Sequence, residues 1–148
     1  MIGWLFPSPL PEGTVAPDFV LPDSAGVLNK LSSLRGQKEV VLIWYPGDDT
    51  RICTQQLCAF KKNWESVTAR GLAVFGINPQ NAASHERFKQ KYALPFPLLI
   101  DEGHRVGKLY HTSGWLVRRT VYRIDREGII RFARRGVPSI DEILGQTE

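Results

Sequence analysis

The sequence predicts an α/β protein in which one sheet lies between two layers of helices, a three-layer α/β/α sandwich. Short apolar runs alternate with amphipathic segments along the chain, and the first two runs are almost uniformly apolar, as in a sheet covered on both faces. The chain has 148 residues, of which 43% are apolar, so it has the size of one domain and enough apolar side chains for a core. We therefore expect a single domain over residues 1–148.

Four short apolar segments are predicted to be strands. They are residues 40–44, 73–77, 97–100 and 120–124. The sequence Asp-Arg-Glu-Gly at 125–128 predicts a hairpin turn that leads into a further strand from Ile129. With the intervening helices, the expected order is β-α-β-α-β, then a β-hairpin and a last helix.

Helical periodicity predicts the helix that carries most of the chemistry. Apolar side chains recur at helical spacing at Leu57, Phe60, Trp64 and Val67. This pattern indicates one helix over residues 53–70, with Gly71 as its C-terminal stop.

Two more helices are expected. One covers residues 82–92 and ends before Pro95. The other is short and runs through Leu144, because Ser139 and Glu142 form the S-x-x-E pattern of a capping box.

The first 14 residues are expected to form an N-terminal arm. They include an apolar stretch with no basic start, interrupted by Pro7, Pro9 and Pro11. This stretch is far shorter than the roughly 20 apolar residues of a membrane-spanning helix. We expect no membrane span and, by default, a cytoplasmic protein.

Positive charge is concentrated in the last third of the chain. Residues 104–136 hold nine Lys and Arg residues against Asp125 and Glu127. Such a stripe is compatible with nucleic acid or an acidic protein partner. The favoured interpretation is a solvated basic face, because the arginines alternate with strand residues and no nucleic-acid-binding motif accompanies them; we expect no nucleic-acid partner.

The two cysteines, Cys53 and Cys58, lie five positions apart directly behind a predicted strand. Two cysteines are too few for a disulfide scaffold, and a lone close pair suggests reactive thiols. If the helix begins near residues 50–53, Cys53 lies in its first turn, where free N–H groups and the helix dipole stabilise a thiolate. The negative charges of Asp48 and Asp49 would destabilise this thiolate if their side chains faced the sulfur.

Helical projection separates the two thiols. Cys53 lies on the apolar stripe and is expected to face inward, whereas Cys58 is about 140° away and is expected to face solvent. Their Cα atoms stand about 8 to 9 Å apart in an intact helix, beyond the roughly 7 Å limit for a disulfide. A disulfide between Cys53 and Cys58 would therefore require the first turns of the helix to unwind.

Spacing alone leaves other interpretations open. A buried cysteine such as Cys53 often has only a packing role, with an unreactive thiol. A metal site is disfavoured because C-x4-C is not the spacing of zinc ligands and no histidine shows ligand spacing with it. A cysteine protease would need a partner histidine, and no histidine is singled out.

A wider motif is more specific. Pro46, Thr50 and Cys53 form P-x3-T-x2-C after an apolar strand, which resembles the active-site signature of the peroxiredoxins. With Cys58 at the fifth position after Cys53, the sequence most resembles the peroxiredoxin Q, or bacterioferritin comigratory protein, group. The likeness extends over most of the chain, through the segments APDFVLPDSAG, LSSLRGQKEVVLIWYPGDDT, CTQQLCAF, FGINPQ, KYALPFPLLID and RRTVYRIDREGII.

This resemblance implies a thioredoxin-like fold and a thiol-dependent peroxidase without metal or organic cofactor. Cys53 would be the peroxidatic cysteine, which attacks hydrogen peroxide or an organic hydroperoxide and becomes a sulfenic acid. Cys58 would resolve it as an intramolecular disulfide, which a thioredoxin-like protein reduces. We expect a monomer.

The same resemblance assigns the remaining site residues. Thr50 would hold the peroxide, Pro46 would shield the thiolate from water, and Arg119 would stabilise the thiolate and the leaving oxygen. Arg118 is the competing choice for that arginine. Thr50 could also act as a helix N-cap, a role it could fill at the same time, and Arg119 could instead be one more member of the basic stripe.

The chain departs from the family pattern at the active site. It has Arg51 and Ile52 where many relatives have Pro-Gly, and Gln56 where a glutamate is common. An alternative function on the same fold is a thiol redox sensor or a protein-binding module.

Overall fold

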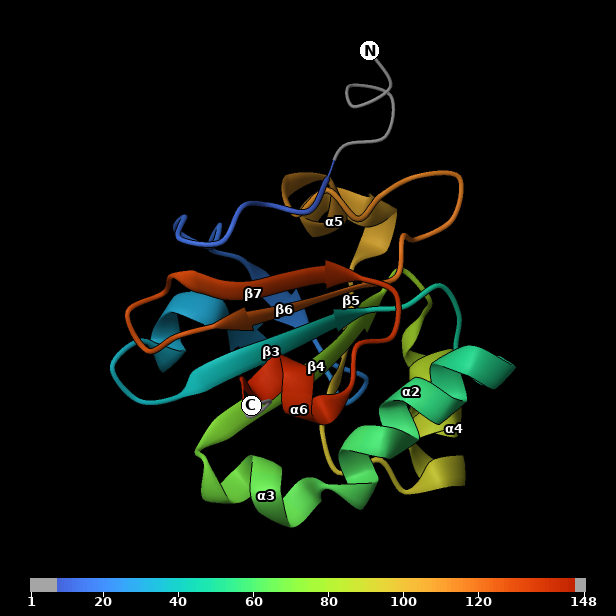
Figure 1. Ribbon diagram of the computed structural model, residues 1–148. Helices are drawn as coiled ribbons and strands as arrows, with labels where there is room; N and C mark the ends of the chain where they lie inside the picture. The colour runs from blue at the N-terminus through green and yellow to red at the C-terminus, as the bar shows by residue number, and fades with distance from the viewer. Residues whose placement is uncertain (1–7, 146–148) are drawn as a thin grey trace.

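The computed structural model describes residues 8–145 and is built around a five-stranded sheet (Figure 1). The strands lie in the order β5-β4-β3-β6-β7. Strands β3, β4 and β5 are parallel, whereas β6 pairs antiparallel with both β3 and β7. The bounds are β3 Glu39–Trp44, β4 Leu72–Asn78, β5 Leu98–Ile100, β6 Thr120–Ile124 and β7 Ile130–Arg135. All four predicted strands are therefore present within one residue of their predicted limits, and the strand after the hairpin turn starts one residue after Ile129.

Helices and a small second sheet surround this core. The longer elements are α2 Arg51–Lys62, α3 Trp64–Ala69 and α4 Ala82–Tyr92. The short ones are α5 Arg105–Leu109, α6 Ile140–Leu144 and the 3-10 turns η1 Leu31–Leu34 and η2 Glu102–His104. The second sheet pairs β1 Val20–Pro22 with β2 Leu28–Lys30. Sequence patterns had not indicated β1, β2, η1 or α5.

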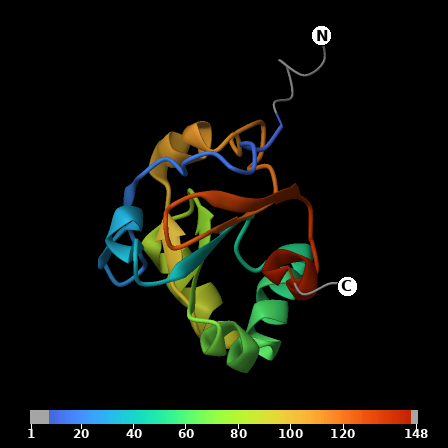
Figure 2. The same cartoon turned by 60° about the vertical axis from the view of Figure 1, so that its left-hand side comes forward.

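The sheet separates two apolar clusters, which confirms the expected layers (Figures 1 and 2). On one face, alternate residues of β3 such as Val41 and Ile43 pack with side chains from α2, α3, α4 and α6. On the other face, Leu42 and Trp44 pack with side chains from α5, η1 and the β1–β2 hairpin. Alternation along β3 therefore buries both of its faces, as its uniformly apolar sequence predicted.

The prediction of one helix over residues 53–70 was wrong, because two helices meet at Asn63. The backbone of Asn63 leaves the helical region, with φ −103° and ψ 21°. Its side-chain amide donates to the carbonyl oxygen of Ala59 at 2.8 Å. Asparagine competes for backbone hydrogen bonds in this way and so favours a helix end.

The predicted ends of the other helices are confirmed. Helix α4 begins and ends where its pattern placed it. At α6, the Ser139 side chain accepts from the backbone N–H of Glu142, and the Glu142 side chain accepts from the backbone N–H of Ser139, a complete capping box. The hairpin turn is closed by the N–H of Gly128, which donates to the carbonyl of Asp125, and Gly128 adopts φ +85°. Glycine takes this left-handed conformation without a steric cost.

Part of the predicted arm over residues 1–14 lies against the sheet, and its first seven residues lie outside the described residues. The N–H of Leu10 donates to the hydroxyl of Tyr122 at 2.9 Å, and the N–H of Gly13 donates to the carbonyl of Ile130 at 2.7 Å. His111 donates to the carbonyl oxygen of Ser8. None of the helices within residues 8–145 is long and apolar enough to cross a membrane.

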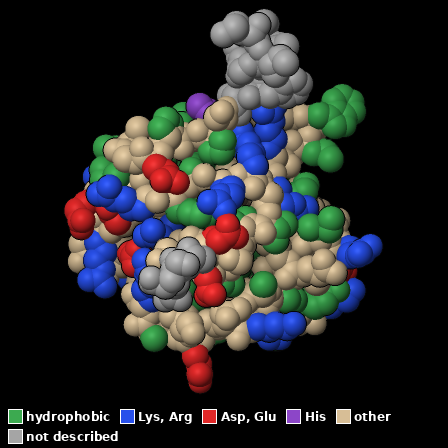
Figure 3. All heavy atoms as spheres, in the orientation of Figure 1, with side chains coloured by type: hydrophobic (Ala, Val, Ile, Leu, Met, Phe, Trp, Pro, Cys, Tyr) green, Lys and Arg blue, Asp and Glu red, His purple; other side chains and the backbone are tan. Residues whose placement is uncertain are grey.

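The basic stripe at residues 104–136 is partly neutralised within the chain. Arg123 pairs with Glu39, Arg131 with Asp125 and Arg134 with Glu142. On the face drawn in Figure 3, Lys and Arg side chains lie among Asp and Glu side chains. This arrangement favours the interpretation of the stripe as a mixed, solvated surface.

Candidate active site

The site is formed where β3 ends and α2 begins. Strand β3 ends at Trp44, the loop 45–50 follows, and α2 starts at Arg51, so Cys53 is the third residue of the helix. Cys53 has no exposed surface. Thr50 occupies the N-cap position, but its side chain makes no capping hydrogen bond. The N–H groups of the first turn of α2 are thus left to stabilise negative charge near Cys53.

The side chain of Arg119 reaches the sulfur of Cys53. Its Nη1 lies 3.2 Å from Cys53 Sγ and 3.0 Å from the Oε1 of Gln56. Arg119 precedes β6 directly, and its carbonyl accepts from the N–H of Gly136 at 2.9 Å, which fixes its backbone between two strands. The guanidinium is therefore a held cation beside the sulfur.

The competing arginine lies elsewhere. The Nε of Arg118 lies beside Gly114, so close that a Cβ built on that glycine would be only 3.0 Å from it. Its backbone N–H donates to the carbonyl oxygen of Thr112 at 2.7 Å. The geometry therefore places Arg119, and not Arg118, at the sulfur.

Gln56 orients this cation without adding charge. It is 3% exposed, accepts from Arg119 and lies 3.4 Å by its Nε2 from the carbonyl oxygen of Gly136. The glutamine at this position thus keeps a hydrogen bond to the arginine, as its amide allows.

An open depression is bordered by Arg119, the residue that contacts the buried sulfur. Its lining residues are Pro46, Gly47, Thr50, Arg51, Ile52, Leu116 and Arg119. Three of the five predicted site residues, Pro46, Thr50 and Arg119, therefore line the same depression. The hydroxyl of Thr50 donates to the carbonyl oxygen of Gly47 at 2.9 Å, so Thr50 is the N-cap residue by position but does not cap through its side chain. The side chains of Ile52 and Leu116 are more than half exposed and give the rim an apolar part.

Both cysteines lie within the continuous helix α2 as free thiols. Cys58 is half-buried and packs against the same apolar cluster that contains Cys53. The expectation that Cys58 faces solvent was thus only partly right, because neighbouring side chains cover part of it.

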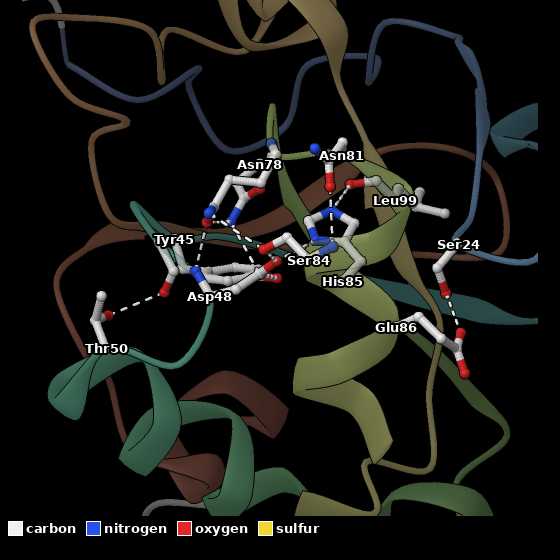
Figure 4. Close-up of polar contacts among 12 residues, drawn as sticks. Ser24, Tyr45, Asp48, Thr50, Asn78, Asn81, Ser84, His85, Glu86 and Leu99 are labelled. Carbon is white, nitrogen blue, oxygen red and sulfur yellow. Dashed lines mark hydrogen bonds and ion pairs between the residues drawn. The ribbon is translucent and has the colours of Figure 1, made fainter. Parts of the chain in front are cut away.

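Asp48 and Asp49 both contact side chains of helix α4. The carboxylate of Asp48 lies 2.6 Å from Nδ1 of His85, and that of Asp49 lies 2.9 Å from Nζ of Lys91 (Figure 4 shows the Asp48 contacts). Burial raises the pKa of Asp48, but hydrogen bonds from His85, Tyr45 and Ser84 outweigh it and hold the pKa below its usual value. Hydrogen bonds from Lys91 and Tyr92 likewise lower the pKa of Asp49.

Sequence reasoning missed the residues behind the loop. Tyr45, Ser84 and His85 contact Asp48 although 3 to 37 positions separate them from it. One signal was present: His85 lies three positions before Phe88, on the buried face of α4. A polar residue on an apolar helical face needs a buried partner.

The arrangement provides a sulfur nucleophile with a fixed cation. Arg119 can stabilise a thiolate on Cys53 and negative charge that develops on an oxygen beside it. Within residues 8–145, no three His, Cys, Asp or Glu side chains are grouped so as to hold a metal ion.

Known proteins resemble this chain in sequence and architecture. The model of the AhpC/TSA family matches residues 13–133. Chloroplastic peroxiredoxin Q of Triticum aestivum is 39% identical over 140 residues, which cover 92% of this chain. The putative peroxiredoxin bcp of Coxiella burnetii is 38% identical over 131 residues, which cover 80% of this chain and 83% of that protein. The chain spans 64% of the length of the wheat protein.

Solved structures agree with the sequence matches. Peroxidoxin BcpB of Mycobacterium tuberculosis superposes with a TM-score of 0.82 and 26% identity, over 91% of this chain and 92% of that one. A cysteine-to-serine mutant of PrxQ from Xylella fastidiosa has the same TM-score at 20% identity, over 93% of both chains. These matches confirm the thioredoxin-like fold and the resemblance to the peroxiredoxin Q group. The chain belongs to the AhpC/TSA family.

Proposed function

We propose that this protein is a thiol-dependent peroxidase that reduces hydrogen peroxide and organic hydroperoxides. The observation that carries the proposal is the contact between Arg119 and the buried sulfur of Cys53, at 3.2 Å, in the first turn of α2. The names of the relatives support the same chemistry.

In the first step, Cys53 acts as the peroxidatic cysteine. Its thiolate attacks the terminal oxygen of the hydroperoxide, an S–O bond forms, and the O–O bond breaks. The sulfur becomes a sulfenic acid, and the leaving hydroxide or alkoxide takes a proton. Arg119 stabilises the thiolate and then the departing oxygen.

Thr50 and Pro46, which line the depression beside Arg119, assist this step. The hydroxyl of Thr50 exchanges its bond to the carbonyl of Gly47 for one to the peroxide, and Pro46 keeps bulk water from the sulfur. Ile52 and Leu116 give the rim apolar surface, which suits the alkyl part of an organic hydroperoxide.

In the second step, Cys58 resolves the sulfenic acid. Its sulfur attacks that of Cys53, a disulfide forms, and water leaves. The two sulfurs border one apolar cluster, but about 8 to 9 Å separates Cα atoms five residues apart in a helix, so the first turns of α2 unwind for this step. A thioredoxin-like dithiol protein then reduces the disulfide by thiol–disulfide exchange.

Steady-state peroxide consumption with thioredoxin, thioredoxin reductase and NADPH tests the proposal. The wild-type protein is expected to consume peroxide in proportion to its concentration, and Cys53→Ser, which replaces one sulfur atom by oxygen, is expected to be inactive. Equal consumption by the folded Cys53→Ser variant would overturn the assignment of Cys53.

A further inference from the structure

A buried carboxylate lies in the loop that carries the proposed peroxide-binding residues. Asp48 is only two positions from both Pro46 and Thr50, and its side chain is 3% exposed. Its oxygens accept hydrogen bonds from Tyr45 at 2.6 Å and Ser84 at 2.7 Å, and lie 2.6 Å from the ring of His85 (Figure 4). A buried charge of this kind requires compensation.

Both ring nitrogens of His85 face oxygen atoms, so the ring is placed to compensate the carboxylate. Its Nε2 lies 2.9 Å from the carbonyl oxygen of Leu99, an acceptor, so this nitrogen carries a proton. Its Nδ1 faces the carboxylate of Asp48, which two hydroxyl donors also contact. Because both ring nitrogens face acceptor oxygens, the geometry suits an imidazolium paired with a carboxylate.

Tyr45 connects this pair to the sulfur site. Its hydroxyl donates to Asp48, and its ring packs in the same buried cluster as Cys53. Burial raises the pKa of Tyr45 well above its ordinary value, and the negative charges of Asp48 and Cys53 raise it further. Tyr45 therefore links Asp48, through its hydroxyl, to the buried cluster that contains the sulfur.

The packing of Tyr45 depends on a glycine in the next strand. A Cβ at Gly76 would lie 3.0 Å from the Tyr45 ring and 2.8 Å from Leu98. The sheet thus leaves room for the tyrosine to lie between Asp48 and the core.

We propose that Asp48 and His85 are a positioning pair for peroxide reduction: the buried ion pair anchors the 46–50 loop to α4, and the charge of His85 cancels that of Asp48 near Cys53. This inference rests on the proposed function, because the loop and the sulfur are those of the proposed site. Neither residue touches the substrate; both act through the loop and through the electrostatic potential at the sulfur.

The groups that face the pair come from every neighbouring element. They are Tyr45 directly after β3, Asn78 at the end of β4 with Gln80 after it, Ser84 of α4 and the carbonyl of Leu99 in β5. Arg87 of α4 lines the same pocket as Asp48. Asp49 is the next carboxylate along the loop, and Lys91 pairs with it. Of the groups named, His85 is the cation-forming side chain in hydrogen-bond contact with the Asp48 carboxylate.

The test measures the reactivity of Cys53 without peroxide. All variants carry Cys58→Ser, and alkylation of the remaining thiol by iodoacetamide is followed against pH. His85→Gln leaves the carboxylate uncompensated, so its profile is expected to move up by about one pH unit, with about tenfold slower alkylation at neutral pH. Asp48→Asn is expected to produce no upward move, and the double variant Asp48→Asn/His85→Gln is expected to return toward the parent.

A matched control separates this effect from a general loss of structure. Glu86→Gln removes a carboxylate from the next position of α4, where Glu86 accepts from Ser24 and Gln90, away from the loop (Figure 4). Its profile is expected to coincide with that of the parent. If the pair only stabilised the fold, both single variants would change the profile alike and the double variant would not recover.

A second measurement does not depend on any variant. Nitrogen-15 NMR of the histidine rings in the wild-type protein is expected to show both nitrogens of His85 protonated at neutral pH. A neutral His85 ring, or an unchanged alkylation profile in folded His85→Gln, would overturn the proposal. Absence of peroxidase turnover with the expected profiles would instead refute the proposed function and leave the charge coupling in place.

Discussion

The guanidinium of Arg119 lies 3.2 Å from the sulfur of Cys53, although 66 positions separate the two residues in the chain. The contact joins the strand that begins with Thr120 to the first turn of α2. The same Nη1 donates to the Oε1 of Gln56. Gln56 therefore orients the guanidinium that contacts Cys53 on the same helix.

Replacing this arginine tests its role. Arg119→Met removes the cation and is expected to slow oxidation of Cys53 by peroxide about a hundredfold or more, as loss of a transition-state donor does. Arg119→Lys keeps the charge but not the planar fork and is expected to recover only part of the rate. Stopped-flow oxidation measures both. Arg118→Met is the matched control, and a larger loss there than in Arg119→Met would reverse the assignment.

Cys58 is expected to be needed for turnover but not for the first chemical step. Cys58→Ser should consume about one equivalent of peroxide and then stop, because the sulfenic acid lacks its intramolecular partner. Peroxide consumption with and without thioredoxin provides the measurement. Normal cycling of Cys58→Ser with thioredoxin would remove Cys58 from the mechanism.

Oxidation is expected to loosen the start of α2. Both cysteines lie in one continuous helix, where a disulfide does not fit, so the oxidised form should show faster amide exchange across residues 51–60. Exchange in β6 serves as the internal reference, because this strand is paired on both sides within the sheet. Equal protection of residues 51–60 in both redox forms would contradict the geometric argument.

A partly buried carboxylate at the start of β3 makes stability depend on pH. Glu39 accepts from Arg70 at 2.9 Å and from Arg123 at 3.0 Å. Burial raises its pKa, but the two arginines outweigh this and leave the pKa below its ordinary value. A carboxyl group with a lowered folded pKa contributes stability above its unfolded pKa of about 4.3 and loses it as the pH falls through the folded pKa.

Glu39→Gln should therefore destabilise the protein by about 1 to 3 kcal/mol at neutral pH, the range for hydrogen bonds to charged groups and their loss. The difference from wild type should shrink as the pH falls below about 4. Urea unfolding at both pH values measures it. A difference that is equal at both pH values would show that the charge of Glu39 does not contribute.

Much of the fold could be predicted because its main elements carry strong local patterns. The strand at residues 120–124 and the helix at residues 82–92 have the predicted limits. The missed elements are short: β1 and β2 have three residues each and α5 has five, too few for a period to show. Asn63 divided the predicted long helix through its own hydrogen bond to Ala59, a local effect that apolar spacing does not record.

The site was predictable to a different extent. The motif identified Pro46, Thr50 and Cys53 because they are close in sequence, and the family resemblance favoured Arg119 over Arg118. The partners of Asp48 could not be predicted, because the contact with His85 depends on how α4 packs against the loop after β3. Side-chain pairs across distant elements are fixed by tertiary packing, which spacing along one segment does not encode.

The most direct test of the central claim is the intact mass of the reduced protein after one equivalent of hydrogen peroxide. Formation of the Cys53–Cys58 disulfide predicts rapid loss of two hydrogen masses in the wild-type protein. Cys53→Ser should keep its mass under the same conditions. An unchanged wild-type mass, or equal oxidation of Cys53→Ser, would contradict the account.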